Sequence, residues 1–228
     1  MKRRTRLLPT LETLLIAAAV LGGVKCAKAR RSQKYDKSSE TWPQWMHNLR
    51  EVSQKHAGAF KWQNSKFNQH NGKLERANDF LAWLLGRRNE PSEADTMNCH
   101  QCVLYLHHQA GFLSKERLQS IYGVDGPGGM RDIDRFDNLY KGMGVPRARE
   151  ISIDDALEGF LFPPGTFVFF NKTKHVAMAI GEGEYVSLWH TPNEKDSLQV
   201  LALEELLGLE AWDSVKVLEN PFGLNDDL

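Results

Sequence analysis

Apolar residues recur at three- and four-residue spacing in several stretches of the first two thirds of the chain. Between residues 98 and 111 the apolar stripe is formed by Cys102, Val103, Leu106 and Ala110. This spacing predicts a helix with one buried face. Asn98 is a suitable N-cap, with Thr96 as the alternative, and Gly111 is a suitable end.

Similar patterns predict further helices on both sides of this segment. One begins near Trp42, and a second runs through Leu74 and Leu84 and is closed by Gly86. Two more are expected near 115–122 and 133–143, with a glycine-rich loop between them.

After the Pro-Pro-Gly sequence that ends at Gly165, the pattern changes to short apolar runs. These runs predict strands at 166–170, 175–180, 185–190, 198–201 and 214–218. A tight turn joins the second strand to the third, and a short acidic helix is expected at 203–207. Helices followed by antiparallel strands indicate an α+β fold.

The chain divides into an N-terminal segment and one larger domain. Residues 1–40 contain a basic opening, an apolar run and a polar linker, whereas the domain is expected over 41–228. Within the domain, residues 41–90 form a helical part and 95–228 the core that carries the chemistry. This division is ordinary for a chain of 228 residues.

The N-terminal segment has the outline of a secretory signal. Basic residues precede an apolar run over 14–24, and Ala27-Lys28-Ala29 has the small-x-small form of a cleavage site. The two interpretations are an export or anchor segment and a poorly packed helix. We therefore expect membrane contact only through residues 1–29, if at all.

Composition restricts the classes of partner and chemistry. The chain has 29 Lys and Arg against 29 Asp and Glu, so its zero net charge gives no electrostatic case for a nucleic-acid partner. The three cysteines are too few for a disulfide framework.

Cys99 and His175 are the candidate catalytic pair. Cys99 lies just inside the N-terminus of its predicted helix, where the helix dipole favours a thiolate. Free backbone N–H groups at that end could bind the oxyanion of an acyl-transfer intermediate. His175 begins a strand, and its face continues with Ala177 and Ala179, which would allow the Cys99 helix to pack closely.

A third group should orient the imidazole. If Glu182 and Gly183 form a two-residue hairpin loop, His190 lies directly opposite His175 and is the expected orienting residue. A shifted register would instead bring Ser187 or Trp189 closer to His175.

Three segments together resemble one family. Asn-Cys-His-Gln-Cys-Val from Asn98 is similar to the Asp-Cys-Ser-Gly-Phe-Val helix of NlpC-type cell-wall peptidases. Pro164 begins Pro-Gly-Thr-Phe-Val-Phe-Phe, which is similar to their Pro-Gly-Asp-Leu-Val-Phe-Phe strand. His175 begins His-Val-Ala-Met-Ala-Ile-Gly, which resembles their His-Val-Gly-Ile-Tyr-Ile-Gly strand. The resemblance covers roughly residues 95–190.

The resemblance implies a papain-like α+β fold, in which a central antiparallel sheet packs on the cysteine helix, with N-terminal helices added. It implies cleavage of amide bonds in peptidoglycan stem peptides, with Cys99 as nucleophile and His175 as base. The family's third polar residue, twelve after the histidine, falls on Ser187 and not on His190. Asn98 replaces the family's aspartate, and a histidine and a glutamine replace its serine and glycine.

The implied setting is a bacterial protein that is exported and acts in the periplasm of its own or a target cell. By analogy with effectors delivered between bacteria by type VI secretion, an immunity protein or a secretion-system carrier is the expected partner. No metal or organic cofactor is required. Two alternatives stay open, namely a papain-like deamidase, protease or acyltransferase toxin that acts on a protein, and a non-catalytic binding module.

Other cysteines and histidines have simpler interpretations. Cys102 lies within the apolar stripe and is expected to be a buried core residue. Cys99 and Cys102 also form a Cys-x-x-Cys pair typical of zinc or redox sites, although no second pair exists. His107 and His108 are expected on the solvated side of the helix.

Overall fold

The computed structural model describes residues 42–67, 73–124, 148–154, 162–171, 174–189, 197–208, 215–219 and 221–222. Its centre is an antiparallel sheet with the strand order β5-β10-β6-β7-β8-β9. The strands are β5 (Arg149–Ile151), β6 (Phe167–Phe170), β7 (His175–Gly181), β8 (Glu184–Leu188), β9 (Leu198–Ala202) and β10 (Val215–Leu218).

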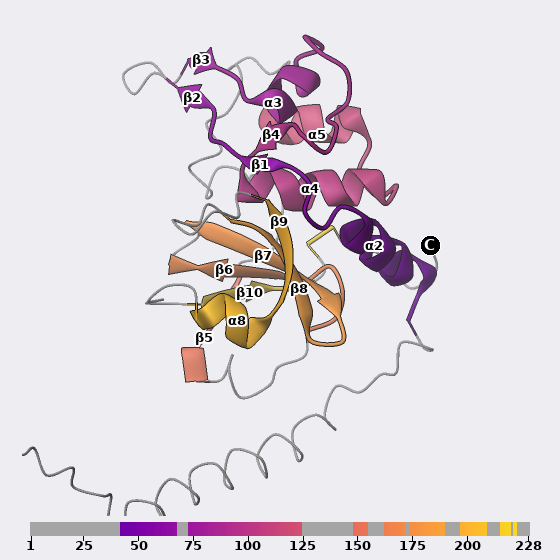
Figure 1. Ribbon diagram of the computed structural model, residues 1–228, viewed down its shortest axis with the longest axis vertical. Helices are drawn as coiled ribbons and strands as arrows, with labels where there is room; N and C mark the ends of the chain where they lie inside the picture. Colours follow the sequence, from indigo (N-terminus) through magenta and orange to yellow (C-terminus); the bar gives the residue numbers. More distant parts are fainter. Residues whose placement is uncertain are drawn as a thin grey trace, which may run out of the picture.

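Helices cover both faces of this sheet. On one face lie α2 (Gln44–Lys55) and α4 (Cys99–Gln109), and α3 (Asp79–Leu84) and α5 (Lys115–Tyr122) lie beyond α4 (Figure 1). Figure 1 shows α4 lying directly against the sheet on this side and α8 (Leu203–Gly208) on the opposite side. The mixed α+β class expected from the sequence is confirmed.

Two buried clusters correspond to the two faces. The larger cluster joins the apolar side of α4 to alternate residues of β7, which are Val176, Met178 and Ile180. The smaller cluster contains the intervening Ala177 and Ala179 together with apolar residues of α8. Successive side chains of a strand point to opposite faces, so β7 separates the two parts of the core.

In the described part of the chain, four short strands lie outside the central sheet. β1 (Lys61–Trp62) pairs in parallel with β4 (Thr96–Met97), and β2 (Lys66–Phe67) pairs antiparallel with β3 (Leu74–Arg76). Pairing of β4, which ends two residues before Cys99, fixes the approach of the chain to α4. The helix that we expected to run through Leu74 begins only at Asp79, as α3. The first part of that prediction is wrong, because Leu74 belongs to β3.

Helix α2 is held against the β7–β8 hairpin. The guanidinium of Arg50 donates to the carbonyl oxygens of Ile180 and Gly181 at 3.1 and 3.0 Å. It also forms ion pairs with Glu182 and Glu184 at 2.8 and 2.7 Å. These contacts fix the position of α2 at the turn that the sequence predicted between the two strands.

Candidate active site

Cys99 is the first residue of α4, as the sequence predicted. Asn98 is the N-cap, and its side chain accepts a hydrogen bond from the backbone N–H of Gln101. The Gln101 side chain accepts in return from the Asn98 N–H, which completes a capping box. The Cys99 side chain is only 4% exposed. The thiol is thus held at the positive end of an eleven-residue helix.

A buried polar network supports this helix terminus. Asn78 donates through Nδ2 to Gln101 Oε1 at 2.5 Å and to the Gln63 carbonyl oxygen at 2.7 Å. Its Oδ1 accepts from the N–H of Leu81 and so caps α3. One buried amide therefore connects α3, α4 and the segment after β1. This role of Asn78 was not predicted from the sequence. The one available signal was the Asn98-x-x-Gln101 spacing, which is the signature of a capping box and marks the Gln101 side chain that Asn78 contacts.

His175 is the first residue of β7 and is 7% exposed. Its Nε2 lies 2.6 Å from Oγ of Ser187, which is fully buried. The indole of Trp189 meets the imidazole edge-to-face, with ring centroids 4.0 Å apart and planes at 82°. Because Trp189 is itself 5% exposed, the hydrogen bond is shielded from water.

The hairpin register differs from the one that would place His190 opposite His175. Gly181 pairs with Glu184, but the register then shifts, and Ala179 pairs with Tyr185. Continuing this shifted register brings Trp189 opposite His175, with Ser187 as the diagonal neighbour on the same face. The expected pairing of His190 is therefore wrong. His190 itself lies outside the described residues.

The face of β7 that α4 covers is also not the one we expected. Cys99 belongs to the buried cluster that includes Val176 and Met178. Ala177 and Ala179, which share the His175 face, belong to the cluster on the α8 side. Small residues on the histidine face therefore do not serve the packing of α4, which lies instead against the face formed by Val176, Met178 and Ile180.

His100 connects these two elements. It follows Cys99 in the first turn of α4 and is buried. Burial lowers the pKa of His175 well below its usual value, and the charge of His100 lowers it further. An imidazole on the first turn of α4 thus acts electrostatically on the first residue of β7. The first turn of α4 and the start of β7 are therefore close enough for this electrostatic effect, and the lowered pKa favours the neutral imidazole of His175.

Two other residues of α4 are core residues. Cys102 is fully buried, as expected, and burial raises the pKa of its thiol. The expected exposure of His107 is wrong, because its side chain is fully buried beside Phe222 and Phe167. Its Nδ1 lies 2.7 Å from the Val103 carbonyl oxygen. Burial lowers the pKa of His107 to about 4.

The part of the chain that the structure describes contains no group of three or more His, Cys, Asp or Glu residues arranged to hold a metal ion. Nor do the described ranges include a helix that is long and apolar enough to span a membrane. The alternative zinc interpretation of Cys99 and Cys102 thus gains no further ligand there.

Comparison with known proteins gave no match to any family model, curated protein or solved structure.

Proposed function

We propose that this protein is a cysteine hydrolase with a papain-like arrangement, in which Cys99 is the nucleophile and His175 the base. The observation that carries the proposal is the hydrogen bond between His175 and Ser187, at the end of β7 where His100 and the N-terminus of α4 converge. A cysteine at a helix N-terminus and an oriented, neutral imidazole are the two groups that thiol-dependent acyl transfer needs.

The first turn of α4 suits the thiol and its tetrahedral intermediate. The helix dipole lowers the free energy of the Cys99 thiolate. The capping box occupies the N–H groups of Asn98 and Gln101. We assign the stabilisation of the oxyanion, which forms when the thiolate adds to a carbonyl, to the positive end of the α4 dipole.

Ser187 determines which nitrogen of His175 acts as the base. When Nε2 carries the proton and donates it to Ser187 Oγ, the lone pair is on Nδ1. Nδ1 then accepts the Cys99 proton and later delivers it to the leaving amine. The low pKa of His175 keeps the imidazole neutral, which a base requires. In this proposal Ser187 takes the orienting role first given to His190.

The proposed substrate is the stem peptide of bacterial peptidoglycan. This choice rests on the resemblance of three segments to NlpC-type peptidases, whose third polar residue aligns with Ser187. The same resemblance extends the proposal to a protein that is exported and acts in the periplasm. There it would be an antibacterial effector with an immunity partner. The thioester formed on Cys99 would be hydrolysed by water, and no metal or organic cofactor takes part.

Digestion of purified muropeptides tests this function. Wild-type protein should release cleaved stem peptides that mass spectrometry identifies, whereas Cys99→Ala and His175→Ala should release none. Cys102→Ala is the matched control, because it removes a thiol from the same helix but leaves Cys99 in place.

Two results would overturn the peptidoglycan assignment. Intact muropeptides together with a modified host protein would favour a deamidase, protease or acyltransferase. Equal activity of the wild type and Cys99→Ala would exclude a thiol-dependent enzyme of any kind and leave the binding module.

A further inference from the structure

Cys99 and Cys102 occupy the first and fourth positions of α4, and neither forms a disulfide. Side chains three residues apart are neighbours on a helix, with Cβ atoms about 5–6 Å apart. A disulfide needs a Cβ separation of about 3.5–4.5 Å. The difference is small, and it falls in the first turn of α4.

The two thiols have different environments. Cys99 keeps 4% of its surface exposed at the helix terminus, whereas Cys102 is completely buried. Burial is the larger cause of the raised pKa of Cys102, and the charge of Cys99 is the second. The two sulfurs are therefore close enough to interact electrostatically. Both thiols are buried, and of the two only Cys99 keeps exposed surface, so exchange would begin at Cys99.

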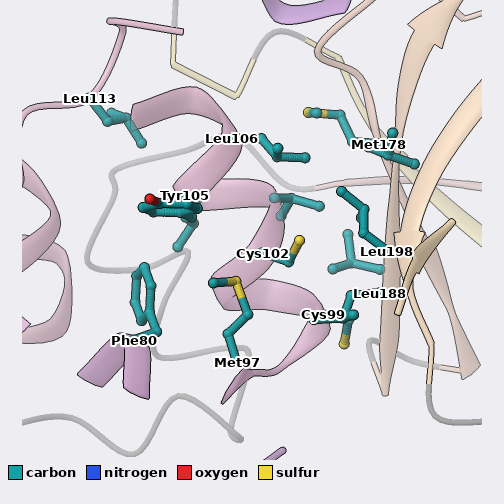
Figure 2. Close-up of a cluster of buried hydrophobic side chains, with 14 of the residues drawn as sticks. Phe80, Met97, Cys99, Cys102, Tyr105, Leu106, Leu113, Met178, Leu188 and Leu198 are labelled. Carbon is teal, nitrogen blue, oxygen red and sulfur yellow. The ribbon is translucent and has the colours of Figure 1, made fainter. Parts of the chain in front are cut away.

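A disulfide requires rotation of at least one of the two side chains. Figure 2 shows the sulfur of Cys102 pointing toward the later turns of α4 and that of Cys99 pointing the other way. Cys99 is the first helical residue, so no earlier turn restricts its χ1 rotamers. Cys99 can therefore turn its sulfur toward Cys102, and Cys102 must also rotate within the core before an S–S bond can form.

We infer that a low-molecular-weight disulfide oxidises Cys99 and Cys102 to an intrahelical disulfide that reversibly blocks Cys99. The Cys99 thiolate first attacks one sulfur of the small disulfide, which forms a mixed disulfide and releases one thiolate. Cys102 then loses its proton and attacks the Cys99 sulfur, which releases the second thiolate. The protein loses two protons and two electrons, and the small disulfide is reduced to two thiols.

The inference does not depend on hydrolase activity, so the test reads the thiols directly. The full-length chain with Cys26→Ser is incubated folded with oxidised glutathione, alkylated with iodoacetamide and digested with trypsin. The peptide over 89–115 contains both cysteines. It should be unalkylated and two hydrogen atoms lighter than the reduced peptide, and dithiothreitol should restore two alkylatable thiols.

Two further variants in the same Cys26→Ser background separate the steps. Cys102→Ala should stop at the glutathione adduct of Cys99, and Cys99→Ala should acquire no adduct. Cys102→Val, with circular dichroism as the folding check, replaces Cys102→Ala if the alanine variant does not fold. A glutathione adduct that persists on Cys99 when Cys102 is present would overturn the inference, as would two alkylated cysteines after oxidation.

Discussion

Nε2 of His175 and Oγ of Ser187 lie 2.6 Å apart on neighbouring strands. The hydrogen bond fixes the orientation of the imidazole, and the edge-to-face contact with Trp189 holds the same ring from a second side. Both partners are buried. These contacts restrict the orientation of the imidazole and therefore the direction in which Nδ1 faces.

Removal of the Ser187 hydroxyl should slow catalysis without removing the nucleophile. In Ser187→Ala the imidazole loses its Nε2 partner, so its tautomer and orientation are no longer fixed. We expect kcat to fall by roughly tenfold to a hundredfold. Muropeptide digestion rates measure this effect, and Ser120→Ala, at an exposed helix position, is the control. An unchanged rate in Ser187→Ala would contradict the orienting role.

Asn78 should contribute strongly to stability. Asn78→Ala removes the cap of α3 and leaves the buried Oε1 of Gln101 with one donor fewer. The free energy of unfolding should fall by about 2–4 kcal/mol. Urea denaturation measures the loss, and Asn89→Ala at an exposed position should change stability by less than about 0.5 kcal/mol. Similar values for the two variants would contradict the proposed network.

Acidification should destabilise the protein through His107. The pKa of this buried histidine is about 4 in the folded chain and 6.5 when unperturbed, so the unfolded chain binds the proton first as pH falls. The stability that depends on a neutral His107 is fully present above about pH 6.5 and is lost as the pH falls toward 4. The resulting loss in the free energy of unfolding is about 3 kcal/mol. The pKa values of His56 and His175 are also lowered in the folded chain, so these two residues add to the loss of stability at low pH.

Denaturation at pH 7 and pH 4 tests this dependence. His107→Leu should retain part of the stability that the wild type loses, because the group that takes up the proton on unfolding is absent. The dependence caused by His56 and His175 should persist. If His107→Leu and the wild type lost the same free energy between these pH values, His107 would not be the group responsible.

Gly181 should not tolerate a side chain. Its φ of +91° lies in the region that favours glycine, and a Cβ at this position would overlap the ring of Trp42. Gly181→Ala should lower the free energy of unfolding by about 2–4 kcal/mol. Gly208→Ala is the control, since no atom lies within 4 Å of its added Cβ. Adding Trp42→Ala to Gly181→Ala should restore only the part of the stability that the overlap removes, because the positive φ remains. If Gly181→Ala were as stable as the wild type, neither the overlap nor the backbone strain would be real.

Elements with strong local signals could be predicted from the sequence. The helix that begins at Cys99 has an N-cap, an apolar stripe and a terminating glycine, and its observed bounds agree with those signals. The strands from β6 to β10 also agree, because each is a short apolar run between turn residues. β3 was missed because apolar residues at 74 and 77 continue the spacing of the helix that follows.

The candidate site was harder to predict because it depends on pairing. A single register shift in the β7–β8 hairpin exchanges His190 for Trp189 opposite His175. Alternation along β7 gave two faces, but not which one α4 covers, since both faces of the strand are apolar and buried. His107 was placed on the exposed side of its helix, yet the side chain is buried and its Nδ1 lies beside the carbonyl oxygen one turn earlier.

The pH dependence of Cys99 alkylation tests the thiolate and its base most directly. In the Cys26→Ser background, iodoacetamide should modify Cys99 near neutral pH, with an apparent pKa below the ordinary thiol value of about 8.5. In His175→Ala the apparent pKa should rise and the rate at pH 7 should fall by about tenfold or more. If both chains show one profile with an ordinary thiol pKa, Cys99 and His175 do not act as a pair.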